Sequence, residues 1–145
     1  MDAFEAISLP ESSAMPTHKR FSVAQANRAL SLVQRIVLDI VREYAHLREL
    51  HSECGRLDAA GEAARAEELR GQYALVTDRL SALREELDEV GCELKDYAAG
   101  LVDFPASIDG RDIVLCWMLG EERVSYWHDL GTGFAGRQPI DSDWA

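Results

Sequence analysis

The sequence predicts an α+β fold in which a long antiparallel two-helix hairpin, resembling a coiled coil, precedes a small antiparallel β-meander and a Gly-rich C-terminal loop. Two observations carry this prediction. Apolar residues recur at steps of three and four over residues 22–90, and strict alternation replaces this spacing after Gly91. The chain has 145 residues, the size of one domain.

The first helix is predicted to begin at Ser22, because Ser22 and Gln25 form a capping-box pattern. Phe21 precedes the cap and is expected to pack onto the first turn. Gly55 is expected to end the helix. Between these limits one apolar stripe runs along the helix, made of Ala26, Leu30, Val33, Val37, Ile40, Tyr44 and Leu47.

A second helix is predicted to begin within residues 57–67 and to end at Gly91. Its stripe has the same spacing: Leu69, Tyr73, Val76, Leu80, Leu83, Leu87 and Val90. Two matching stripes joined by a short polar connection predict an antiparallel hairpin. The positions beside the stripes are rich in Arg and Glu, Arg84 among them, and are expected to face solvent.

Four further apolar residues lie beside the first stripe: Leu32, Ile36, Val41 and Leu50. One partner helix cannot cover both them and the stripe, so the rest of the chain or a second copy of the protein must do so. This double stripe favours self-association as a homo-oligomer, with a dimer as the preferred state.

Alternating runs at residues 101–108 and 111–119 flank Asp109-Gly110, which predicts a β-hairpin with a two-residue turn. In this register Ile108 pairs with Arg111 and Val102 with Trp117. Pro105 lacks an N–H, so its strand is expected to be an edge or to be partly paired. One face is apolar (Val102, Phe104, Ala106, Ile108, Ile113, Leu115, Trp117), and the other carries Asp103, Pro105, Ser107, Asp112, Val114, Cys116 and Met118.

Residues 120–123 are predicted to turn into a strand at residues 124–128. Continuing the same register places Val124, Tyr126 and His128 on the apolar face and Trp127 opposite Cys116, and a bulge would invert this assignment. The expected boundaries are a flexible tail at 1–20, one domain at 21–140 (hairpin 22–90, sheet and loop 92–140) and a second tail at 141–145.

A series of short motifs follows Gly91: Lys95-Asp96, residues 100–105 (GLVDFP), Asp109-Gly110-Arg111, Leu115-Cys116-Trp117, Leu119-Gly120-Glu121, Tyr126-Trp127-His128 and residues 133–139 (GFAGRQP). In order and spacing they resemble the uncharacterised prokaryotic family catalogued as domain of unknown function 2203, over residues 21–140. The resemblance implies that the specific motifs lie in the sheet and terminal loop. It implies no activity.

Charge and composition exclude several classes of protein. The net charge is −11, and residues 58–93 carry ten acids against four arginines, a surface that repels nucleic-acid phosphates. The longest apolar run, residues 113–119, is far shorter than the roughly 20 residues of a membrane span, and the first nineteen residues lack signal-peptide features. Three cysteines without a C-x-x-C pair indicate reduced thiols and a cytoplasmic protein.

The main candidate site combines a titratable base, carboxylates and cations, the inventory of a small-anion or metal site or of acid–base catalysis. Within it, Glu121 and His128 are the candidate metal ligands. In the structural alternative, Arg137 pairs with Asp103 or Glu121 and His128 donates to a backbone carbonyl. The candidate ligand-binding residues are Lys95, Asp96, Asp103, Glu121, Trp127, His128 and Arg137.

Two weaker candidates remain. Glu43 and His46 form a Glu-x-x-His pattern, as in di-iron helical bundles, but the second helix has no histidine, so only a second copy would supply the other half. Cys116 as a nucleophile is weighed against a small core residue, and its predicted face, opposite to His128, favours the core.

No motif specifies a cofactor, and whether the protein is an enzyme stays open. Two function hypotheses follow from these patterns. The first is a self-associating interaction or structural module built on the hairpin. The alternative is a small-ligand or metal-binding protein, with an enzyme as a special case, that uses the polar cluster of the C-terminal sheet and loop.

Overall fold

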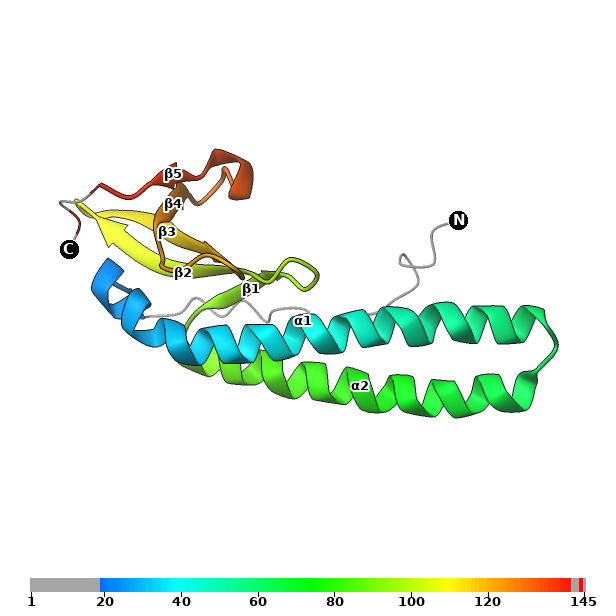
Figure 1. Cartoon of the computed structure of the whole chain (residues 1–145). Helices are drawn as coiled ribbons and strands as arrows, with labels where there is room; N and C mark the ends of the chain where they lie inside the picture. Colours follow the sequence, from blue (N-terminus) through cyan, green and yellow to red (C-terminus); the bar gives the residue numbers. More distant parts are fainter. Residues whose placement is uncertain (1–18, 142–143, 145) are drawn as a thin grey trace.

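The computed structural model describes residues 19–141 and 144 and confirms the α+β arrangement (Figure 1). Helices α1 (Val23–Ala59) and α2 (Ala63–Val90) form the hairpin. A five-stranded antiparallel sheet covers the end where α1 begins, and the hairpin extends well past it (Figure 1). Its strands are β1 (Glu93–Asp96), β2 (Leu101–Ile108), β3 (Arg111–Met118), β4 (Tyr126–Asp129) and β5 (Gln138–Pro139). Of the predicted tails at 1–20 and 141–145, residues 1–18, 142–143 and 145 lie outside the described residues.

The start of α1 is the predicted capping box. The Gln25 N–H donates to Ser22 Oγ at 3.0 Å, and the Ser22 N–H donates to Gln25 Oε1 at 2.9 Å. The expected end at Gly55 is wrong, because α1 continues to Ala59. Leu57 is buried in the hairpin and Cys54 Sγ donates to the Ala66 carbonyl, and this packing outweighs the roughly 1 kcal/mol that a helical glycine costs.

The end of α2 matches the prediction at Gly91. Gly91 has a left-handed backbone with φ 107°, and its N–H bonds to the carbonyls of Leu87 and Asp88. Only glycine adopts this conformation without a steric cost. Lys19 Nζ donates to the Val90 carbonyl at 3.0 Å, so the chain entering α1 also closes the end of α2.

Arg84 does not face solvent as expected. It is buried, and Nη1 donates to the Tyr97 hydroxyl at 2.9 Å. Tyr97 belongs to the connection between β1 and β2, which folds back onto the hairpin so that its ring lies 5.7 Å from that of Tyr44 on α1. The helix pattern alone could not reveal this burial, because the covering residue comes from another element.

The sheet follows the chain order β1-β2-β3-β4-β5, and the β2–β3 register is the predicted one, from Ile108 opposite Arg111 to Val102 opposite Trp117. The apolar face of these strands joins the α1 stripe in one core. Pro105 is partly paired, since β1 reaches only Leu101–Asp103, and its carbonyl accepts from the Phe21 N–H at 2.8 Å.

The predicted register of β4 is wrong by one residue. Cys116 pairs with Tyr126 and Leu115 with Trp127, so Trp127 lies on the core face, and Tyr126 and His128 lie on the outer face. The cause is Val124, which is buried as predicted but bonds to α1 rather than to β3: its N–H donates to Asn27 Oδ1 at 2.8 Å. The chain therefore enters β4 one residue out of the extrapolated alternation.

The predicted Gly-rich loop contains two short elements, a 3₁₀ turn η2 (Phe134–Gly136) and the strand β5, which pairs with β4. Trp144 lies 5.2 Å from Trp127, ring centre to ring centre, on the core face of the sheet. The C-terminal segment thus closes the sheet edge at β4, and the outer strand is too short to be predicted from its two residues.

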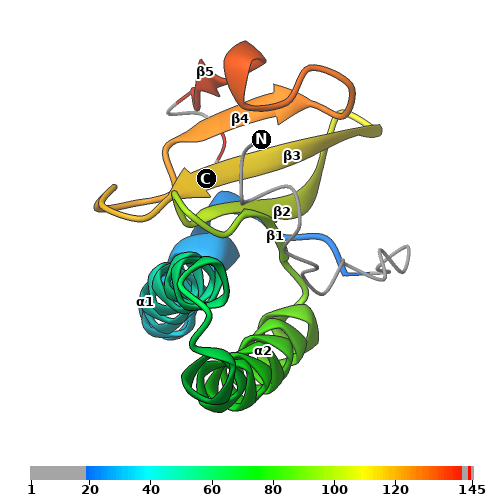
Figure 2. The same ribbon diagram turned by 90° about the vertical axis from the view of Figure 1, so that its right-hand side faces the viewer.

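The chain itself covers most of the apolar flank of α1. Ile36 and Leu50 are buried and Val41 packs against the core, whereas Leu32 keeps 43% of its surface exposed. Viewed along the hairpin, α1 lies between the sheet and α2 (Figure 2). No helix in the described part of the chain has both the length and the apolar character that crossing a membrane requires.

Candidate functional site

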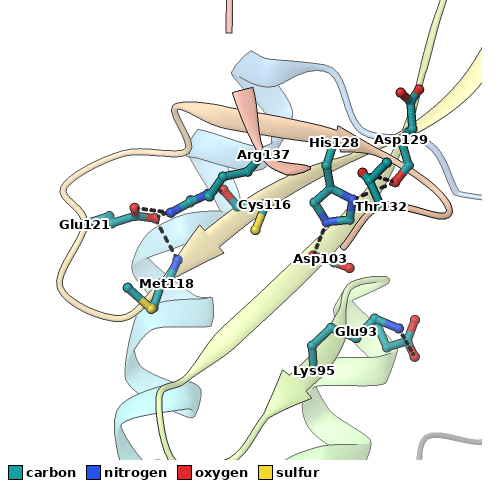
Figure 3. Close-up of polar contacts among 10 residues, drawn as sticks. All are labelled: Glu93, Lys95, Asp103, Cys116, Met118, Glu121, His128, Asp129, Thr132 and Arg137. Carbon is teal, nitrogen blue, oxygen red and sulfur yellow. Dashed lines mark hydrogen bonds and ion pairs between the residues drawn. The ribbon is translucent and has the colours of Figure 1, made fainter. Parts of the chain in front are cut away.

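Four of the residues selected from the sequence as ligand-binding candidates lie in two neighbouring clusters on the sheet (Figure 3). One joins Arg137 to Glu121 at the turn after β3, and the other joins Asp103, Cys116 and His128 on the outer face of β2, β3 and β4. The two clusters differ in the number and the length of the hydrogen bonds that their side chains make.

The first cluster, the Arg137–Glu121 pair, is a two-pronged ion pair. Arg137 Nη1 and Nη2 donate to the two carboxylate oxygens of Glu121 at 2.8 and 2.9 Å, and Nη2 also donates to the Cys116 carbonyl at 3.1 Å. The guanidinium carbon lies 3.9 Å from the Tyr126 ring centre. The Met118 N–H donates to Glu121 Oε1 at 2.8 Å. Every oxygen of Glu121 is thus occupied.

Partial burial by itself would raise the pKa of Glu121. The hydrogen bonds from Arg137 and from the Met118 N–H, together with the Arg137 charge, outweigh that effect and lower the pKa below its ordinary value. This is the structural alternative considered for Arg137, realised with Glu121. Glu121 is held away from His128, so the predicted Glu121–His128 ligand pair is not formed.

The second cluster, the Asp103–Cys116–His128 group, is the only set of three or more candidate metal ligands within residues 19–141 and 144. One ligand atom from each residue lies within 4.8 Å of the other two, and all three residues are buried. Asp103 and Cys116 are direct cross-strand partners, and His128 on β4 lies opposite Val114, two residues from Cys116. The strand register alone brings the three together.

The proton positions on His128 follow from its neighbours. Nδ1 lies 2.7 Å from the Asp129 carbonyl oxygen, which can only accept, so Nδ1 carries a proton. Nε2 lies 3.4 Å from Asp103 Oδ1, beyond the 2.7–2.9 Å typical of charge-assisted hydrogen bonds. Nε2 and the carboxylate therefore face each other without a short bond between them.

Burial dominates the electrostatics of this group. It raises the pKa of the Cys116 thiol to about 12, and the neighbouring Asp103 adds to that effect. Burial also raises the pKa of Asp103, against the opposing influence of His128. Cys116 is therefore a protonated thiol, which disfavours the nucleophile hypothesis. The sequence had placed Cys116 and His128 on opposite faces, and the structure corrects this.

The remaining sequence candidates have structural roles or lie outside both clusters. Lys95 pairs with Glu93 at 3.2 Å near Asp103 (Figure 3). Asp96 Oδ1 accepts from the N–H groups of Ala98 and Ala99, which fixes the turn into β2. Trp127 lies on the core face of the sheet, against Trp144.

The Glu-x-x-His pair on α1 is not joined by a third ligand in the described residues. Glu43 accepts a hydrogen bond from Arg79 at 3.2 Å, and His46 is exposed to solvent. A second copy of the chain would still be needed to complete a di-metal site there, as the sequence indicated.

Sequence reasoning found Asp103 and His128 but assigned Cys116 to the core. The sequence analysis allowed for a bulge before the strand that follows residue 123. A bulge there exchanges the two faces of that strand and so places His128 beside Cys116 and Asp103. A Cys, a His and an Asp on one face of three adjacent strands would then have been recognised as a mixed ligand set.

Fold and site together define the class: a helical hairpin that carries a β-meander with a buried Asp-Cys-His group. The family model described as an uncharacterized conserved protein (DUF2203) matches residues 19–140, so the chain belongs to that family. This finding confirms the resemblance carried by the C-terminal motifs. No curated protein and no solved structure significantly matches the chain.

Proposed function

We propose that this protein binds one transition-metal ion of the Zn²⁺ type through Asp103 Oδ1, Cys116 Sγ and His128 Nε2. The observation that carries the proposal is the 3.4 Å separation between His128 Nε2 and Asp103 Oδ1. Two ligands of a tetrahedral ion with bonds of about 2.1 Å lie roughly 3.4 Å apart. The separation is long for a hydrogen bond and matches two ligands of one ion.

The donor chemistry supports the same conclusion. A thiolate, an imidazole and a carboxylate are the three ligand types that zinc takes in proteins. The Nδ1–H of His128 donates to the Asp129 carbonyl, the outer-shell contact that fixes the ring of a metal-bound histidine with Nε2 toward the ion. An ion would remove the Cys116 proton, so binding releases protons and weakens at low pH.

Metal analysis of the purified protein tests the proposal. After incubation with Zn²⁺ and removal of free ion, we expect one zinc per chain by elemental analysis and by native mass spectrometry. Cobalt(II) in the same site should give the intense absorption of a thiolate-bound tetrahedral ion. Cys116→Ser and His128→Ala should each abolish stoichiometric binding, since two remaining ligands do not hold zinc in competition with a chelator.

Cys92→Ser is the matched control. Cys92 is also buried, and burial raises the pKa of its thiol to about 12, but it belongs to no ligand group among the described residues. It should bind zinc as the unaltered chain does. The proposal fails if the unaltered protein takes up no zinc or cobalt, or if Cys116→Ser binds as tightly as Cys92→Ser.

Self-association of the hairpin stays a prediction, and it ranks second because part of its basis is gone. Four apolar residues beside the α1 stripe suggested a partner that covers them. The chain itself buries Ile36 and Leu50 and packs Val41 against the core, so only Leu32 of the four stays exposed. The native mass spectrum reads subunit count and bound mass together, so it tests this prediction in the same measurement. A monomer at micromolar concentration would contradict it.

A further inference from the structure

The Gly-rich connection between β4 and β5 lies against two of the three residues of the Asp103–Cys116–His128 group. At one end, the Asp129 carbonyl that accepts from His128 Nδ1 also accepts from Thr132 Oγ1 at 3.2 Å and from the Thr132 N–H at 3.3 Å. At the other end, Arg137 Nη2 donates to the Cys116 carbonyl at 3.1 Å. The connection therefore bonds to the backbone beside each of these ligands.

Three donors converge on one carbonyl oxygen, and two of them come from Thr132. A carbonyl dipole with several donors is held in one orientation, because rotating the peptide would break all of these bonds together. The orientation of the Asp129 carbonyl determines where His128 Nδ1 points. It therefore also determines the direction of Nε2, on the opposite side of the ring (Figure 3).

The glycines of this connection explain how Thr132 reaches that carbonyl. A Cβ atom at Gly136 would lie 2.5 Å from Thr132 Cβ and 2.7 Å from Thr132 Oγ1. Real Cβ contacts are longer, so any side chain at position 136 would displace the threonine. Gly136 also directly precedes Arg137, whose pair with Glu121 holds the far end of the connection.

We infer that Thr132 is a positioning residue of this metal site and that the connection of residues 130–137 forms its outer shell, orienting His128 for the ion. The inference rests on the metal binding proposed above. Outer-shell partners of this kind set affinity without touching the ion, and their loss typically lowers metal affinity about 10–100-fold. The Gly-Thr-Gly-Phe-Ala-Gly sequence thereby has a role in the site: it holds the Thr132 hydroxyl against the Asp129 carbonyl.

Zinc titration of three variants of the full chain tests the inference. Thr132→Val keeps the shape and removes the hydroxyl, and it should raise the zinc Kd about tenfold or more. Thr132→Ser restores the hydroxyl and should bind as the unaltered chain does. Gly136→Ala should weaken binding in the same direction as Thr132→Val, because it pushes Thr132 away from Asp129.

Thr77→Val is the matched control. Thr77 Oγ1 also donates to a backbone carbonyl, that of Tyr73 at 3.0 Å, but both residues belong to α2 and not to the sheet. It should leave the zinc Kd unchanged. Nitrogen chemical shifts of His128 in the metal-free protein provide a second measurement: Thr132→Val should lower the fraction of rings that are protonated at Nδ1, while the melting temperature stays close to that of Thr77→Val.

The outcomes separate the two proposals. If the unaltered chain binds zinc and Thr132→Val binds equally well, the positioning role is overturned and the metal site stands. If Thr77→Val weakens zinc binding as much as Thr132→Val, a general loss of stability explains both, and the positioning role is again overturned. If the unaltered chain binds no metal, both proposals fail.

Discussion

The Arg137–Glu121 pair and the Asp103–Cys116–His128 group lie on neighbouring parts of one sheet and show opposite uses of polar residues. In the first, four donated hydrogen bonds and an aromatic face surround the charges, and Arg137 Nε is the buried side-chain atom of the pair that has no hydrogen-bond partner among the described residues. In the second, three buried groups converge with one long contact of 3.4 Å. An ion pair with several short hydrogen bonds contributes to stability, whereas buried polar groups that are held by a long contact have a stability cost that a ligand would offset.

Breaking the Arg137–Glu121 pair should have the largest effect on stability. Arg137→Met keeps much of the side-chain volume and leaves the Glu121 carboxylate partly buried without its cation. We expect a loss of about 2 kcal/mol in the free energy of unfolding, less than for a fully buried pair because 21% of the Glu121 side chain is exposed. Urea unfolding measures it.

The control for that variant is Arg56→Met. Arg56 also pairs with a glutamate, Glu53, but on the exposed surface of α1, where ion pairs contribute little. Its urea midpoint should stay where it is in the unaltered chain. If Arg137→Met also leaves the midpoint unchanged, the Arg137–Glu121 pair is not the stabilising member of this comparison.

Replacing the polar residues of the Asp103–Cys116–His128 group by apolar ones should have a smaller effect on stability, of the opposite sign. The double variant Asp103→Val with His128→Leu removes both facing polar groups, and we expect the metal-free protein to gain about 1 kcal/mol. Asp103→Val alone should destabilise, because it leaves the buried imidazole without its partner. Thermal unfolding in the presence of a chelator distinguishes the two. A double variant that is as unstable as Arg137→Met would show that both clusters are structural.

The smallest effect concerns pH. The pKa of Glu121 is lower in the folded protein than its ordinary value of 4.5. A lowered carboxyl pKa contributes stability that is present above the unfolded pKa and is lost as the pH falls through the folded one. The difference between the unaltered chain and Arg137→Met should therefore shrink as urea unfolding is moved from neutral pH to about pH 3. A difference that stays constant would contradict the charge-based account of the pair.

Local signals in the sequence were sufficient for much of the fold. The capping box at Ser22, the left-handed Gly91 and the Asp109-Gly110 turn each act within a few residues, and the start of α1, the end of α2 and the β2–β3 turn that they mark were predicted correctly. The β4 register was not, because Asn27, 97 residues away in the chain, holds Val124. The burial of Arg84 likewise depends on Tyr97 from another element.

The contrast between local signals and long-range contacts also explains why the candidate site was only partly predicted. Asp103, His128 and Arg137 were selected for their chemistry, which the sequence states directly. Their grouping depends on the strand register. Because the predicted register of β4 was shifted by one residue, Cys116 and His128 were expected on opposite faces. Glu121 was expected to pair with His128 as a metal ligand, whereas it pairs with Arg137. Thr132 was not selected, because its hydroxyl acts through a backbone carbonyl that has no sequence signature.

Every strand of the sheet pairs with its neighbour in the chain, and the two helices also pair with each other across a short turn. Both parts can therefore form from contacts that are close in sequence, and such contacts form quickly during folding. The bonds from Phe21 to Pro105 and from Asn27 to Val124 close loops of more than 80 residues. We expect the docking of the first turns of α1 onto the sheet to be the slow step of folding.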